Sequence, residues 1–186
     1  MNTFSDEQLV VQVKEGDMGA LETLVRRYMS SMYSFCYGIV HNQHDAQDMT
    51  QEVFLKVWKN IRRFDSEKMF RPWLYRIARN TCLDFLKKKN PIAFSALSIE
   101  GEEEWDVVDM SSSPERFVEK GILRTALEGA LLQLPSLAAE VVALHVYEGY
   151  AFAEIAALNN ESLNTVKSRY RRALERLRGL LSDRVY

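Results

Sequence analysis

The stretch NTVKSRYRRALERLRGLL, residues 164–181, is strongly basic and has the periodicity of a helix. It contains six Lys and Arg residues and one acid, Glu175, in a chain whose formal net charge is −2. Apolar residues recur every three or four positions, which predicts one buried face and one basic face. The predicted buried stripe consists of Leu163, Val166, Tyr170, Ala173, Leu174, Leu177 and Leu181.

The residues that precede this stretch predict a helix-turn-helix. A short helix is expected at about 152–158, although no Ser or Thr caps it at Tyr150-Ala151, which predicts fraying of its first turn. Asn159-Asn160 suits a tight turn because Asn tolerates the left-handed conformation, and Ser162 can cap the second helix. Such a unit presents the front of its second helix to the DNA major groove. A solvated basic face on an ordinary helix is the alternative reading.

The negative charge is concentrated in the middle of the chain. Residues 91–118 have a net charge of −6, whereas residues 1–90 and 119–186 have net charges of +3 and +1. The middle segment shows no sustained periodicity and is rich in Glu, Asp and Ser, which is typical of a linker. We therefore predict an all-α protein with two small helical domains, 1–90 and 114–186, joined by an acidic flexible linker at 91–113.

Helix signals follow one another through the first domain. Ser5 and Gln8 form a capping-box pattern, and Gly16 ends the short helix that they begin. Asp17 can cap a second helix, HNQHD at 41–45 interrupts it, and a third runs from Asp45 to about Ile61. Pro72 is well placed in the first turn of a fourth helix, which ends before Asn90-Pro91. Ser136 is expected to cap a helix in the second domain that ends at Gly149.

Composition excludes several classes of protein. The two cysteines, Cys36 and Cys82, each lie in an apolar helical pattern and are expected to be buried, reduced thiols. The sequence shows no metal-ligand cluster, no nucleophile–base set and no phosphate-binding loop, so we expect no metal, no cofactor and no enzymatic activity. No secretory signal or membrane-spanning run is visible. The default expectation is a cytoplasmic protein without membrane insertion.

Three motifs resemble bacterial RNA polymerase sigma factors. GYAFAEIAALNNESLNTVKSRYRRALERLR, 149–178, resembles region 4, whose helix-turn-helix reads the −35 promoter element. DAQDMTQEVFLKVWKNI, 45–61, resembles region 2.2, and FRPWLYRIARNTCLDFLKKK, 70–89, resembles regions 2.3 and 2.4. With only these two regions and a short linker, the chain resembles the extracytoplasmic-function group of the sigma-70 type. The resemblance implies a subunit that binds core polymerase, recognises the −35 and −10 elements and promotes strand opening in transcription initiation.

The resemblance also implies partners and site residues. The partners would be the polymerase core, through the β′ coiled coil and the β subunit, promoter DNA and an anti-sigma factor. The expected core-binding residues are Asp45, Asp48, Gln51, Glu52, Phe54 and Trp58, although Phe54 and Trp58 could instead fill the core. The expected −10 residues are Arg62, Arg63, Phe64, Phe70, Trp73, Arg76 and Asn80. The expected −35 residues are Asn164, Thr165, Lys167, Ser168, Arg169, Arg171, Arg172 and Arg176.

Two alternatives remain open at the level of sequence. A stand-alone helix-turn-helix regulator would need no polymerase, although such proteins usually dimerise and no heptad run is visible. The acidic segment EGEEEWDVVD, 100–109, could act as a nucleic-acid mimic in the basic RNA path of polymerase, or it could mask the basic helices. A solvated tether is the plain alternative.

Overall fold

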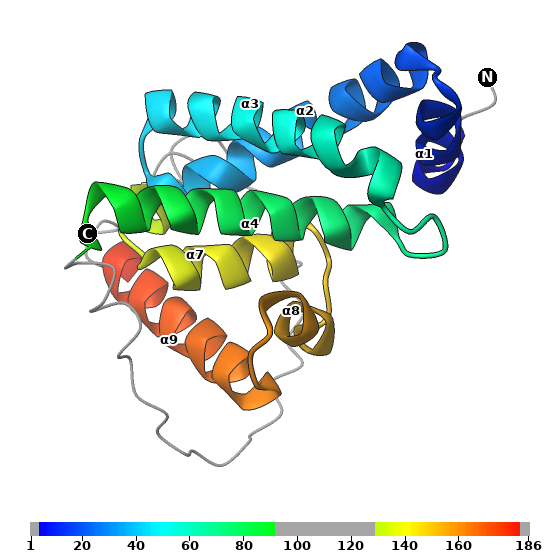
Figure 1. Ribbon diagram of the computed structural model, residues 1–186. Coiled ribbons are helices and arrows are strands. Elements are labelled where there is room, and N and C mark those ends of the chain that lie inside the picture. The colour runs from blue at the N-terminus through cyan, green and yellow to red at the C-terminus, as the bar shows by residue number, and fades with distance from the viewer. Residues whose placement is uncertain (1–3, 92–128, 183–186) are drawn as a thin grey trace. The chain divides into compact units, whose positions relative to one another are not determined.

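The chain divides into two compact units, Met1–Phe94 and Ser95–Tyr186, called here the N-terminal and C-terminal units. The computed structural model describes residues 4–91 and 129–182, and Figure 1 labels their helices. Every regular element in these two ranges is helical. The acidic segment 92–113, which is most of the expected linker, lies outside the described residues.

In its described residues, 4–91, the N-terminal unit contains four α-helices, and the capping signals in the sequence correctly predicted where the first two begin. They are α1 (Asp6–Glu15), α2 (Met18–Val40), α3 (Gln43–Asn60) and α4 (Phe70–Lys89), with a short 3-10 helix, η1 (Ile61–Arg63), after α3. The capping box of Ser5 and Gln8 is present, with hydrogen bonds of 2.8 and 3.2 Å. Gly16 ends α1 at φ 104°, a conformation that favours glycine, and Asp17 caps α2. The third helix begins slightly earlier than expected because Asn42, rather than Asp45, is its N-cap.

The core of the N-terminal unit lies among α2, α3 and α4, which run side by side in Figure 1. Phe35 of α2 packs edge-on against Tyr75 of α4, with ring centroids 5.0 Å apart. Cys36 and Cys82 are both buried thiols, as predicted. A hydrogen bond with Cys82 lowers the pKa of Cys36, and a second with Thr50 acts in the same direction against the effect of burial. The two thiols are therefore packed together in the core.

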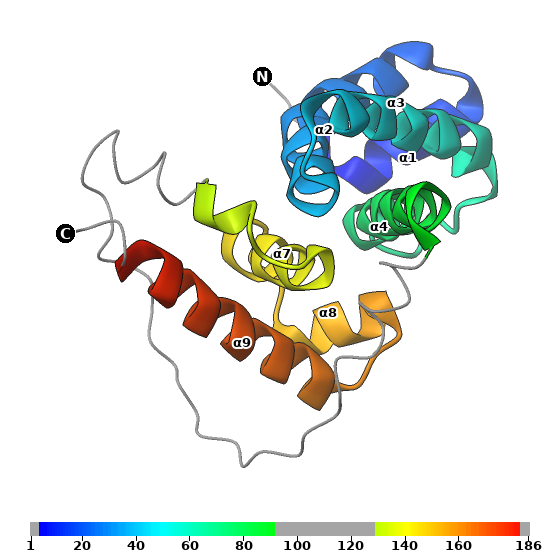
Figure 2. The same ribbon diagram turned by 90° about the vertical axis from the view of Figure 1, so that its left-hand side faces the viewer.

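The C-terminal unit is built from α7 (Ser136–Val142), a π-helical turn η2 (Ala143–Tyr147), α8 (Phe152–Asn159) and α9 (Leu163–Ser182). Figure 2 shows α8 and α9 meeting at a tight turn. Ser136 was expected to be the N-cap of α7, but the cap is Pro135, whose carbonyl accepts from Ala138 and Ala139 at 2.9 Å. Gly149 ends the helical run as predicted, with φ 70°.

One core cluster of the C-terminal unit joins α7 to α9. Its buried members are Ala130, Leu134, Ala138, Ala139, Val142, Ala173 and Leu177. The predicted stripe of α9 is only partly buried: Val166, Ala173 and Leu177 are inside, whereas Leu163 and Leu174 are 40% and 44% exposed. Leu174 follows Ala173, and one helical step turns the side chain by about 100°, which carries it to the edge of the stripe.

Candidate nucleic-acid interface

The turn between α8 and α9 fixes the position of the basic helix. Asn160 adopts the left-handed conformation at φ 56°, as predicted, and its N–H donates to Ala156 O. Ser162 Oγ accepts from Thr165 N at 3.0 Å and lies 2.7 Å from Thr165 Oγ1, so it caps α9. Thr165 is therefore engaged within the cap, and the exposed side chains of α9 begin beside it.

The first helix of the pair is capped by an interaction that sequence analysis missed. Ala151 N donates to Glu154 Oε2 at 2.7 Å, which satisfies an N–H group at the start of α8. His145 Nδ1 lies 2.8 Å from Tyr150 O, and its ring stacks on Phe152 at 4.2 Å. These contacts oppose the fraying that the absence of a Ser or Thr cap had indicated.

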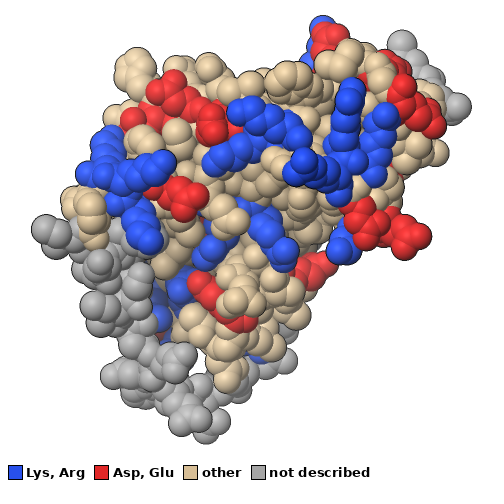
Figure 3. Space-filling model, in the orientation of Figure 1, with Lys and Arg blue, Asp and Glu red and all other residues tan. Residues whose placement is uncertain are grey.

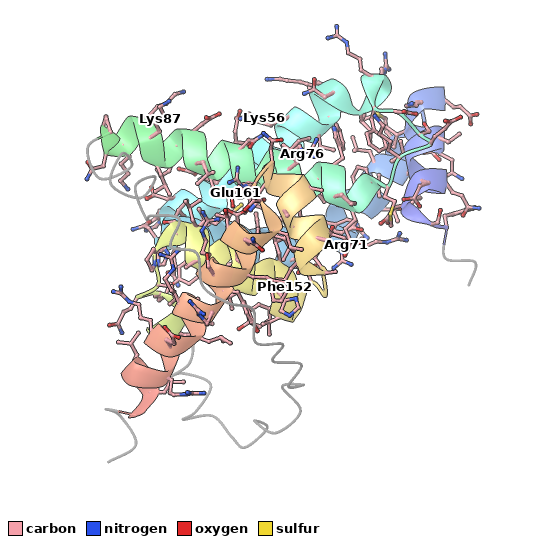
Figure 4. The ribbon with its side chains drawn as sticks, turned by 90° about the horizontal axis from the view of Figure 1, so that it is seen from below. Lys56, Arg71, Arg76, Lys87, Phe152 and Glu161 are labelled. Carbon is pink, nitrogen blue, oxygen red and sulfur yellow. The ribbon has the colours of Figure 1, made fainter. Side chains whose placement is uncertain are left out.

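Tyr170 completes an aromatic cluster at this junction. Its ring centroid lies 5.0 Å from that of His145 and 5.1 Å from that of Phe152, which Figure 4 labels on α8. Partial burial raises the pKa of Tyr170 above its ordinary value. The cluster joins η2, α8 and α9, so it fixes the angle at which α9 leaves the turn. Only Tyr170 of the three had been assigned to the core from the sequence.

The basic residues of α9 lie on two different faces. Asn164, Lys167 and Arg171 are exposed and are spaced three and four positions apart, which places them on one face of the N-terminal half of the helix. This exposed face is called the front of α9. Arg172 and Arg176 are also exposed, but they line a shallow groove together with Leu134, Pro135 and Ala138. Ser168 lies between these faces, half-buried, and its hydroxyl donates to Thr165 O at 3.0 Å.

Arg169 was expected to contact DNA, and the structure gives it another role. Its side chain is only 12% exposed and its Nη1 lies 2.5 Å from Glu161 Oε2. Glu161 precedes α9 and is labelled in Figure 4, so the pair closes the helix-turn-helix across its turn. The guanidinium is occupied by a carboxylate and largely enclosed, which removes it from the surface that the neighbouring Arg171 presents.

The expected −10 residues fall into a buried group and an exposed group. Phe64 and Phe70 are 6% and 1% exposed, so in this structure neither ring is available to stack on a base. Phe64 packs against Trp73 at 4.6 Å and against Phe70 at 6.1 Å, and Trp73 is half-buried. These aromatic rings therefore support the loop at 64–69 from beneath.

The exposed members of the −10 group are Arg62, Arg63, Arg76 and Asn80. The first two lie in η1, whereas Arg76 and Asn80 lie four residues apart on one face of α4. Figure 3 shows lysine and arginine side chains gathered over α4 and over the end of α3. Cations beside a loop and a partly exposed indole form the kind of surface that binds single-stranded nucleic acid.

The outer face of α3 carries the expected core-binding residues. Asp48, Gln51 and Trp58 are exposed, with Trp58 at 52%, whereas Phe54 is half-buried. The indole of Trp58 is therefore a surface group and not a core group. Leu55, which the sequence analysis did not single out, is also exposed on this helix.

Two of the expected core-binding acids are engaged within the unit. Asp45 Oδ2 lies 2.5 Å from Lys89 Nζ, and Glu52 Oε1 lies 3.9 Å from Lys56 Nζ. Lys56 also donates to Thr81 Oγ1 at 3.0 Å. The Asp45–Lys89 and Lys56–Thr81 contacts link α3 to α4, whereas the Glu52–Lys56 pair lies within α3; Figure 4 labels Lys56.

Within residues 4–91 and 129–182, no group of three or more His, Cys, Asp and Glu is placed to hold a metal ion. In the same parts of the chain, no helix combines the length and the apolar character that crossing a membrane requires.

Family models match both units. The model described as sigma-70 region 2 matches residues 24–92, and the model described as sigma-70, region 4 matches residues 124–177. Two solved structures have a similar fold. CnrH in complex with the cytosolic domain of CnrY has a TM-score of 0.65, with 22% identity over 96% of this chain and 97% of its own. Sigma factor RpoE in complex with the anti-sigma factor NepR, from Bartonella quintana, has a TM-score of 0.64, with 20% identity over 87% and 96%.

Curated relatives match at higher identity. The ECF RNA polymerase sigma factor SigW of Bacillus subtilis is 33% identical over 94% of this chain and 95% of its own length. SigE of Mycolicibacterium smegmatis is 33% identical over 90% of this chain and 65% of its own, and the sigma-E factor of Escherichia coli is 31% identical over 92% of each. The two matched regions, the helix-turn-helix and the all-α fold agree with one another, and the chain belongs to the ECF family of RNA polymerase sigma factors.

Proposed function

We propose that the C-terminal unit, residues 114–186, reads the −35 promoter element with the front of α9. The observation that carries this assignment is the exposed row of Asn164, Lys167 and Arg171 at the start of a helix that the preceding turn fixes. An Arg side chain can bind guanine through two hydrogen bonds, and Lys can bind guanine or phosphate. Arg172 and Arg176 flank this row and would bind the phosphate backbone, which positions the unit without reading sequence.

The N-terminal unit, residues 1–90, is assigned to strand opening at the −10 element. Arg62, Arg63 and Arg76 provide cations for the sugar–phosphate backbone. The loop at 62–69 and Asn80 would together hold a flipped base of the −10 element, and the amide of Asn80 can read the edge of that base. Trp73 is half-buried, so its exposed edge would stack on a base at the boundary of the melted region. Phe64 and Phe70 keep a supporting role, because their buried rings shape the loop rather than contact DNA.

The exposed face of α3 is assigned to core polymerase. Asp48 and Gln51 offer oxygen acceptors, and the neighbouring Trp58 offers an exposed indole. Interfaces are enriched in such aromatic anchors, and acceptors beside them suit the Arg side chains of a partner. The expected partners are the β′ coiled coil and the β subunit of polymerase. Asp45 and Glu52 would act mainly by fixing α3 against neighbouring side chains.

An anti-sigma factor is proposed as a further partner. Both structural neighbours described above were solved with a bound protein, and one of these proteins is named as an anti-sigma factor. The chain would work in the cytoplasm, where core polymerase is found, with residues 91–113 as the tether between its two DNA-reading units.

A reconstituted transcription assay tests this function. Core polymerase, the protein and a library of promoter fragments are mixed, and specific transcript starts are mapped. Replacing Arg171 and Arg172 with Ala should weaken use of the −35 element and leave core binding intact. Arg178→Ala is the matched control, because it removes an exposed cation from the C-terminal end of the same helix, about two turns beyond Arg171. Equal loss in the control and in the double variant would contradict the assignment of the helix front to DNA.

A further inference from the structure

Helix α1 contacts both ends of the loop that joins η1 to α4. Lys14, in the last turn of α1, donates to the carbonyl oxygen of Phe64 and to Ser66 Oγ, the latter at 2.8 Å. Glu7, in the first turn of the same helix, accepts from the backbone N–H of Phe70 at 3.3 Å. These residues are separated from the loop by 50 or more positions in the chain, so the contacts are tertiary.

Lys14 provides hydrogen-bond donors to the first half of the loop. The ammonium group has three N–H donors, and two of them are used by Phe64 O and Ser66 Oγ. Both bonds are part-buried, and hydrogen bonds from a charged donor are stronger than neutral ones. The backbone beside Phe64 and the side chain two residues later are thereby fixed to one point on α1.

Glu7 provides a hydrogen-bond acceptor at the other end of the loop, where α4 begins. Helix α4 begins at Phe70 after Met69, whose side chain makes no capping hydrogen bond, so the first N–H groups of the helix need another acceptor. The Glu7 carboxylate provides one from a different helix, and a negative charge at this end of a helix is favourable. The start of α4 is therefore capped by a side chain of α1, a helix distant in the sequence.

Helix α1 is itself fixed to α2. Asp6 accepts from the hydroxyl of Tyr28 and pairs with Arg27, and Arg27 Nη2 also donates to Phe4 O at 2.9 Å. Leu9, Val10 and Val13 are buried beneath the helix. The loop is consequently attached to a helix that is itself packed against and bonded to α2.

Between these two attachments the loop presents an outward tip. Asp65, Glu67, Lys68 and Met69 are exposed. Asp65 Oδ1 accepts from Glu67 N at 3.1 Å, and Lys68 N donates to Asp65 O at 3.0 Å, so the tip is a hydrogen-bonded turn. A site that discriminates between bases must be held close to one geometry by the residues that support it.

We propose that Lys14 and Glu7 are positioning residues, which set the loop at 64–69 in the conformation that selects a base of the −10 element. This inference rests on the proposed −10 function of the N-terminal unit, and it adds α1 to the determinants of promoter specificity. Neither residue contacts DNA in this account. Each acts through the backbone of the loop or of the first turn of α4.

The test uses the full chain bound to core polymerase. A pool of single-stranded oligonucleotides with a randomised −10 segment is bound, and sequencing of the bound fraction gives the base preference at every position. Lys14→Met removes both loop hydrogen bonds and keeps the aliphatic stem, and should reduce the preference at one position about tenfold. Glu7→Ala should reduce the preference at that same position about threefold. Lys14→Arg keeps a donor for the two oxygens and should retain most of the preference.

Matched controls separate an effect on the position of the loop from an effect of the changed charge or of the stability of the unit. Arg26→Met removes one exposed cation from α2, and Glu15→Ala removes one exposed acid from α1. Both should leave every preference unchanged. Hydrogen exchange of the peptide containing residues 64–70 should be faster in Lys14→Met than in wild type, with α2 unchanged.

The possible results distinguish failure of the positioning role from failure of the proposed −10 function. A clear wild-type preference that survives unchanged in Lys14→Met and Glu7→Ala overturns the positioning role and leaves the −10 function standing. A loss that is equal at all positions, together with weaker core binding or a lower melting temperature, also overturns it, because the effect is then on the whole unit. A wild type with no preference at any position overturns both proposals.

Discussion

Arg169→Met should change the stability of the helix-turn-helix and spare its DNA contacts. The Arg169 side chain is 12% exposed and is bonded to Glu161 across the turn, with a nitrogen–oxygen distance of 2.5 Å. A hydrogen bond between charged groups contributes about 1.5–3 kcal/mol. The lower end applies here, because the Glu161 carboxylate keeps some access to water after the change. The expected loss is therefore about 1.5 kcal/mol in the local stability of α8 and α9.

Arg171→Ala is the comparison that makes this prediction sharp. Arg171 Nε lies 3.8 Å from Glu175, one turn away, and both side chains are half-exposed or more. Such a pair contributes about 0.3 kcal/mol. Because each 1.4 kcal/mol is a factor of ten, hydrogen exchange of α9 amides should be about tenfold faster in Arg169→Met and less than twofold faster in Arg171→Ala.

DNA binding should show the opposite order. The holoenzyme with Arg171→Ala should lose about tenfold in affinity for the −35 element, whereas Arg169→Met should stay within about twofold where it is folded. Exchange measured by mass spectrometry and binding measured by anisotropy supply the two readouts. A structural role for Arg169 is contradicted if Arg169→Met leaves hydrogen exchange unchanged and loses as much −35 affinity as Arg171→Ala.

Three further predictions follow from exposed and titrating groups. Trp58→Ala should weaken core polymerase binding at least tenfold in an anisotropy titration and change the melting temperature little, because the indole is 52% exposed. Affinity for promoter DNA falls as salt rises, and Arg171→Ala with Arg172→Ala should make the plot of log affinity against log salt less steep by about two, measured with the holoenzyme. Burial raises the pKa of Tyr170 above 10.0, so the folded state binds its proton more tightly than the unfolded chain does. The resulting stability is present below about pH 10 and is lost as the pH rises through the raised pKa, so the fall in melting temperature above pH 10 should be smaller in Tyr170→Phe than in wild type.

Local signals in the sequence predicted the helix ends that depend on neighbouring residues. Ser5 with Gln8, Asp17 and Asn160 all have the expected role, because capping and left-handed turns are decided within a few positions of the chain. Ser136 failed as a cap because Pro135 offers its carbonyl one residue earlier. The two buried thiols were also predictable, since Cys36 and Cys82 lie in apolar helical patterns.

The candidate site was less predictable where contacts join distant segments. Nothing in the periodicity of α9 shows that Glu161, on the other side of the turn, takes Arg169 away from the basic face. The burial of Phe64 and Phe70 depends on how the loop packs against Trp73, which spacing alone does not give. Lys14 was invisible for the same reason, because its partners are 50 and 52 residues away.

The most direct test of the central account is initiation by a reconstituted holoenzyme. Purified core polymerase and this protein are incubated with a promoter library, and the 5′ ends of the transcripts are sequenced. If the protein directs promoter recognition, transcripts should start at a common distance downstream of two shared sequence elements. These starts should be absent with core alone and reduced by Arg171→Ala with Arg172→Ala. Failure to bind core, or starts that do not depend on this protein, would contradict it.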